Sequence, residues 1–96
     1  MEQKLLDQIA AANDITEVIR EAVELQPAGD YFKGLCPFHH DKTPSFVVSP
    51  TRQIFHCFGC GAGGSVFRFV MNQEHIDFPS AVRKLADRAG IELTEG

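Results

Sequence analysis

The chain has 96 residues, of which 44% are hydrophobic, and a formal net charge of -4. This length suits one small domain over residues 1–96, whose modest core would gain from a cross-link. No run of about 18 apolar residues occurs, and the N-terminus lacks the basic head and apolar core of a secretory signal. We therefore expect a cytoplasmic protein without a membrane partner.

The charges are unevenly distributed along the chain. Residues 1–29 carry six acidic and two basic side chains, and residues 73–96 carry five acidic and three basic ones. Residues 30–72 hold two acidic side chains against four basic ones, namely Lys33, Lys42, Arg52 and Arg68. The centre is mildly basic between acidic ends, which is a weak indication of a nucleic-acid partner.

The N-terminal part predicts two short helices within residues 3–24. Apolar residues recur there at helical spacing, and Asn13 with Asp14 interrupts the pattern. Asp14 followed by Glu17 is typical of a capping box, in which carboxylates accept the unpaired N–H groups at a helix start. The second helix is therefore expected to begin just after Asp14.

The central part, residues 25–64, predicts a small antiparallel sheet built from two hairpins. One hairpin turns at residues 27–30, and the other turns at residues 50–52 between the extended segments 45–49 and 53–57. Alternation along the first hairpin places Tyr31, Lys33 and Leu35 on one face.

Residues 65–90 predict two further helices. Ser65 is a candidate N-cap after a glycine-rich stretch, Pro79 lies near the first turn of the last helix, and Gly90 supplies its stop. Residues 91–93 could add an edge strand. The expected fold class is α+β, with a small antiparallel sheet flanked by short helices.

The three cysteines of the chain belong to two short motifs, a C-x2-H pair and a C-x2-C pair. Two such loops can close a tetrahedron around one zinc ion. The predicted ligands are Cys36, His39, Cys57 and Cys60. His40 is an alternative to His39, ranked lower because His39 makes the two loops equivalent in spacing. With four protein ligands the site would be closed, which disfavours hydrolytic metal catalysis.

Other interpretations of these cysteines fit less well. Three thiols cannot all pair within one molecule, so a disulfide framework is disfavoured. Buried free cysteines and a redox C-x2-C pair remain as alternatives, but neither explains the upstream pair. For His56 and His75 a purely structural role is the better interpretation.

Longer motifs extend this pattern. They are C-P-F-H at 36–39, D-K-T-P-S-F at 41–46, F-H-C-F-G-C-G at 55–61 and D-F-x-x-A-V-x-x-L-A at 77–86. In these motifs the chain resembles the N-terminal zinc-binding domain of bacterial replicative DNA primases, over nearly its whole length.

The resemblance implies a zinc-ribbon domain that engages single-stranded template DNA and supports start-site recognition and the initiation of RNA primers. It also implies that the domain acts on a primase catalytic core, in cis or in trans, and meets the replicative helicase only through the rest of a primase. The polymerase chemistry would lie in a catalytic core beyond Gly96, so this chain alone is not expected to be an enzyme.

A DNA-binding surface can be sought on the sheet independently of this resemblance, because single strands are bound by aromatic platforms and cations. The candidates are Tyr31, Lys33, Lys42, Arg52, Phe55 and His56, with Phe46 adjoining them. For each phenylalanine the alternative is core packing, and for each cation a solvated face.

Three other functional classes compete with the primase interpretation. A structural or regulatory zinc ribbon that binds proteins would show no salt-dependent DNA binding. A thiol-based redox sensor would release zinc under mild oxidation. An independent enzyme is the weakest option, because the sequence has no phosphate-cradling loop with its lysine and no acidic cluster placed for magnesium.

Overall fold

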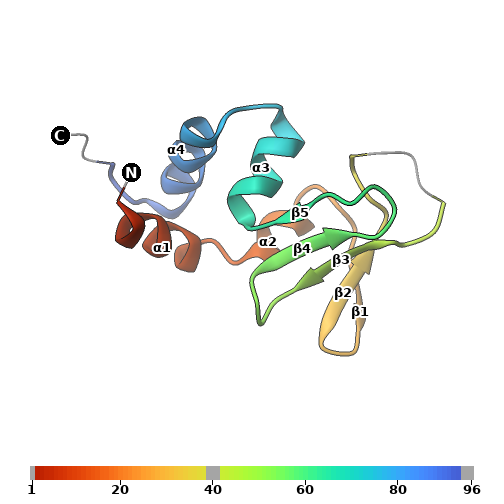
Figure 1. Cartoon of the computed structure of the whole chain (residues 1–96). Coiled ribbons are helices and arrows are strands. Elements are labelled where there is room, and N and C mark those ends of the chain that lie inside the picture. Colours follow the sequence, from red (N-terminus) through yellow and green to blue (C-terminus); the bar gives the residue numbers. More distant parts are fainter. Residues whose placement is uncertain (1, 39–41, 94–96) are drawn as a thin grey trace.

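A computed structural model describes residues 2–38 and 42–93 (Figure 1). Five strands form one antiparallel sheet in the order β1-β2-β3-β4-β5. The helices gather on one side of it. The elements are α1 (Gln3–Ala12), α2 (Ile15–Arg20), β1 (Gln26–Ala28), β2 (Tyr31–Gly34), β3 (Phe46–Ser49), β4 (Ile54–Cys57), β5 (Gly63–Gly64), α3 (Val66–Glu74) and α4 (Phe78–Ala89). This arrangement confirms the α+β class and the presence of both predicted hairpins, although Pro27 and Ala28, which were expected in the first turn, belong to β1.

The sheet has two unlike faces because successive strand residues point to opposite sides. On β3, Phe46 and Val48 are fully buried, and their Cα partners on β4, Cys57 and Phe55, are buried as well. This buried face packs against α2 and α3. The other face, which we call the open face, carries the exposed and half-exposed side chains of Tyr31, Lys33, Val47, Ser49, Ile54 and His56.

A cluster of four phenylalanine rings lies beneath the buried face. Phe46, Phe55 and Phe69 are each at most 2% exposed. Phe38, from the connection after β2, joins them, and neighbouring ring centroids are 5.5 to 6.2 Å apart. Edge-to-face and tilted ring pairs of this kind stabilise a core beyond the area they bury.

The helices also pack against one another, and their buried side chains share one hydrophobic core with the sheet. Helix α4 packs against α1 and α3. The buried side chain of Asn13 donates two hydrogen bonds of 2.9 Å from Nδ2, to the carbonyl oxygens of Ile9 and Leu85. Asn13 thus joins the end of α1 to the middle of α4. None of the helices in the described ranges is long and apolar enough to cross a membrane.

Helix α4 has Pro79 in its first turn and Gly90 at its end, as the sequence predicts, whereas its N-cap residue, Asp77, was not predicted. Asp77 accepts a 3.0 Å hydrogen bond from the Ser80 amide, and hydrogen bonds from Ser80 lower the pKa of Asp77. Gly90 ends the helix in the left-handed conformation, with φ of 71°. Residues 91–93, in contrast, form no strand, whereas Gly63 and Gly64 pair with β4 as the edge strand β5.

The predicted capping box at α2 is wrong, although Asp14 is the N-cap residue. The Asp14 side chain makes no capping hydrogen bond and instead accepts a 2.6 Å hydrogen bond from Gln53 Nε2. The Ile15 amide donates to Gln53 Oε1 at 2.9 Å. Gln53 adopts a left-handed backbone conformation with φ of 55°. A residue of the β3–β4 turn therefore caps a helix 38 positions earlier in the chain.

We predict that Gln53→Ala lowers the free energy of unfolding by about 1–2 kcal/mol, because it removes the cap of α2 and leaves the Ile15 amide without its acceptor. Urea denaturation of the zinc-loaded chain measures this change. Thr51→Ala, at an exposed position of the same turn, is the matched control and should stay within about 0.5 kcal/mol of the unchanged chain. Equal stability of the two variants would contradict the capping role of Gln53.

Candidate metal centre and the open sheet face

The two cysteine loops leave the same end of the sheet. Strands β2 and β4 both pair antiparallel with β3. They therefore run in the same direction, and their C-terminal ends lie at the same end of the sheet. Cys36 follows β2 by two residues, and Cys57 is the last residue of β4. Cys60 completes the turn after β4. The sheet topology thus brings together candidate ligands that are far apart in the sequence.

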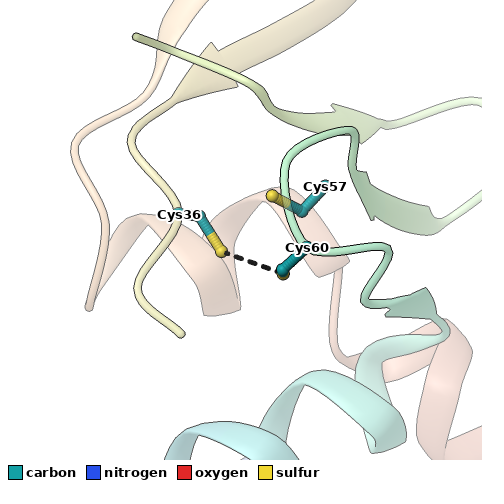
Figure 2. A group of neighbouring side chains, drawn as sticks. All are labelled: Cys36, Cys57 and Cys60. Atoms are coloured by element: carbon teal, nitrogen blue, oxygen red, sulfur yellow. Dashed lines mark hydrogen bonds between the residues drawn. The ribbon is translucent and has the colours of Figure 1, made fainter. Parts of the chain in front are cut away.

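The three thiols converge on one point. Their Sγ atoms all lie within 4.8 Å of one another, and the Cys36 and Cys60 sulfurs are 3.8 Å apart (Figure 2). A tetrahedral zinc with bonds of about 2.3 Å to sulfur holds its sulfur ligands roughly 3.8 Å apart. The thiols therefore already have nearly the spacing that zinc requires.

Burial makes the Cys36 thiol unsuited to ionise without a cation. Cys36 and Cys57 are 6% and 0% exposed, whereas Cys60 is exposed. Burial, followed by the neighbouring Cys57 and Cys60 thiols, raises the pKa of Cys36 to about 12 in the metal-free protein. A bound divalent cation favours the deprotonated form of the cysteine instead, because the thiolate is the form that binds the metal.

Both loops are anchored beside the thiols. The Phe38 amide donates to Cys36 Sγ at 3.4 Å, while the Phe38 ring packs 5.7 Å from the ring of Phe69. In the second loop, the Gly61 amide donates to the Cys57 carbonyl at 2.8 Å, and Gly61 has a φ of 81° that favours glycine. The Cys57 sulfur also lies 3.7 Å from Ser45 Oγ.

The histidine ligand is not placed by this geometry. His39 and its alternative His40 both lie outside the described residues. Their roles therefore stay predictions.

Five of the six candidate DNA contacts lie at exposed positions. Tyr31, Lys33 and His56 lie exposed on the open face, and Arg52 is exposed in the β3–β4 turn. Lys42 is exposed in the connection that leads to β3. These five side chains are accessible to a ligand.

Phe55 requires a correction as a candidate DNA contact. Its side chain is 1% exposed, and that of the adjoining Phe46 is fully buried. Both rings belong to the phenylalanine cluster, because residues of β3 and β4 with this parity point toward the helices. Phe55 and Phe46 therefore pack in the core and are not accessible to DNA.

Phe58, which is 73% exposed, was not among the candidates chosen from the sequence. It follows the buried Cys57, so continuation of the strand alternation would have placed it on the accessible side. Its ring centroid is 4.6 Å from that of His56, in an edge-on arrangement. Phe58 therefore adjoins the open face at the metal centre.

Comparisons with known proteins agree with this geometry. The family model of the CHC2 zinc finger matches residues 1–96. A DNA primase of Geobacillus stearothermophilus is 51% identical over 92 residues, which cover 96% of this chain and 15% of the relative. A DNA primase of Pseudomonas aeruginosa is 45% identical over 91 residues, covering 95% of this chain and 14% of the relative.

A solved structure extends the similarity to three dimensions. The crystal structure of the Aquifex aeolicus primase, with its zinc binding and RNA polymerase domains, matches with a TM-score of 0.89 and 44% sequence identity, over 94% of this chain and 22% of that chain. The chain thus spans a small part of each relative. The converging thiols and the family match together identify a structural zinc ion. The chain belongs to the CHC2 zinc-finger family, the zinc-binding domain of DNA primases.

Proposed function

We propose that this chain binds single-stranded template DNA through the open face and supports start-site recognition and the initiation of RNA primer synthesis. The observation that carries the proposal is the asymmetry of the sheet. One face is filled by buried phenylalanines, while the other presents Tyr31, Lys33 and His56 beside the zinc loops. Exposed aromatic rings and cations on a sheet are a common means of binding single strands.

The register of the strands places two of these groups, Lys33 and His56, in one row. Lys33 pairs with Val47, Val47 pairs with His56, and His56 pairs with Gly63. This row crosses four strands of the open face. Within the described residues the Lys33 and Arg52 side chains make no ion pair. Their charges are therefore available to phosphate groups.

The zinc ion has a structural role in this proposal. Cys36, His39, Cys57 and Cys60 would saturate a tetrahedral ion and leave no position for water or substrate. Primer synthesis would instead be performed by a primase catalytic core, in cis or in trans, in the cytoplasm. The replicative helicase would be reached through the rest of a primase and not by this domain.

We predict that the double charge reversal Lys33→Glu, Arg52→Glu weakens binding of an oligodeoxythymidylate by at least about tenfold in low salt. The slope of log affinity against log salt should also fall by about 0.7 for each phosphate that the variant no longer neutralises. Fluorescence anisotropy over a series of salt concentrations measures both quantities. Lys4→Glu, Arg83→Glu makes the same change in net charge on α1 and α4 and should leave the affinity nearly unchanged.

Equal effects of the two double variants would show that only net charge matters and would contradict binding at the open face. Absence of salt-dependent binding by the unchanged chain would favour a protein-interaction module instead.

The functional proposal is tested by primer synthesis on single-stranded DNA, using the separately prepared RNA polymerase core of a primase from the same organism. Addition of the zinc-loaded chain in trans should increase the yield of primers or change their start sites, because it supplies the template contacts. Cys36→Ser should abolish the effect, since it removes a zinc ligand. No effect over a wide concentration range, with full zinc occupancy, would contradict action in trans, and a covalently linked chain then tests action in cis.

A further inference from the structure

A groove of about 390 Å³ lies on the open face next to the second zinc loop. Tyr31 and Lys33 of β2 and Val47 of β3 contribute to its wall, and Phe58 closes it on the side of the metal centre. The remaining lining residues are Pro44 and Ser45. The groove therefore combines two aromatic rings, an aliphatic surface and one cation.

Phe58 is held in an exposed position by its backbone and by its neighbours. Its amide donates a 3.0 Å hydrogen bond to the Ser45 carbonyl, and its ring contacts the ring of His56. Leaving a phenylalanine in water forgoes about 1.5–3 kcal/mol of burial energy. The side chain is nevertheless more exposed than any other large hydrophobic residue in the described part of the chain. Its position in one groove with Tyr31 and Lys33 gives the combination of aromatic rings and a cation that binds single strands.

The dimensions and chemistry of the groove favour a single unpaired base. Its volume lies near the lower end of the roughly 300–1,000 Å³ typical of ligand pockets. Every nucleobase has a flat face that stacks on an aromatic ring. Lys33 can meet the negative charge of the adjoining backbone. A protein loop could use the same apolar surface, but it would not require the cation.

We propose that this groove is a nucleobase subsite in which one template base stacks on Phe58 while Lys33 contacts a flanking phosphate. The inference rests on the proposed binding of single-stranded DNA and assigns one contact within it. Because Phe58 lies between the zinc ligands Cys57 and Cys60, the metal would also fix the position of the stacking ring. Removal of zinc would thus disrupt this contact directly.

The absence of tryptophan from the chain permits a specific optical test. Phe58→Trp places one tryptophan in the groove, whose emission can be excited separately from that of Tyr31, and oligodeoxythymidylate binding should quench this emission by about half or more through stacking. Phe78→Trp, at a 37% exposed phenylalanine of α4, is the matched control and should show little change. Anisotropy of a labelled oligonucleotide, measured in separate samples, reports whether each variant binds DNA.

Affinity provides the second readout. Phe58→Ala should weaken binding by about 5- to 150-fold, which corresponds to the removal of one stacked base, with unchanged zinc content. Phe58→Trp should retain the affinity. Phe78→Ala, the same substitution at a 37% exposed phenylalanine of α4, should change the affinity by no more than about twofold.

The outcomes separate the inference from the proposed function. Saturable DNA binding by the Phe58→Trp variant without quenching of its fluorescence would overturn the subsite and leave DNA binding by this chain intact. Absence of DNA binding by the unchanged chain would overturn both. If Phe58→Ala abolished stimulation of the polymerase core while DNA affinity stayed the same, Phe58 would contact protein, and the subsite would again be wrong.

Discussion

The convergence of three thiols at one end of the sheet is the constraint on which the rest of this structure depends. Their Sγ atoms lie within 4.8 Å of one another, which is close to the spacing that a tetrahedral zinc ion requires, and burial raises the pKa of Cys36 to about 12 in the metal-free protein. Structural zinc contributes about 10–16 kcal/mol in small domains, as much as the entire stability of a typical protein. The ion therefore closes the ends of β2 and β4 in a fold whose own core is small.

The zinc loops connect the two faces of the sheet through a pair of phenylalanines. Phe38, from the first loop, joins the buried ring cluster, whereas Phe58, from the second, lies exposed beside His56. One ring thus couples the metal to the core, and the other couples it to the open face. In the proposed function this arrangement makes the geometry of template binding depend on zinc, even though the ion performs no chemistry.

Local sequence rules predicted the features that depend on neighbouring residues. The paired motifs predicted the converging cysteines, alternation placed Tyr31 and Lys33 on one face, and α4 has Pro79 in its first turn and ends at Gly90 as expected. Features that depend on distant residues were not predictable in this way. The cap of α2 comes from Gln53, across the β3–β4 turn. The burial of Phe55 follows from helices packing on one side of β4, which no short motif specifies.

X-ray absorption spectroscopy at the zinc edge tests the central claim most directly, with the unchanged chain compared with His39→Ala and His40→Ala. A zinc ion held by the two motifs should show three sulfur ligands at about 2.3 Å and one nitrogen at about 2.0 Å. The nitrogen ligand is recognised by the outer-shell scattering of its imidazole ring, which should disappear in His39→Ala and persist in His40→Ala. Two or fewer sulfur ligands in the unchanged chain would contradict a zinc ion held by Cys36, Cys57 and Cys60. Disappearance of the nitrogen only in His40→Ala would move the fourth ligand to His40.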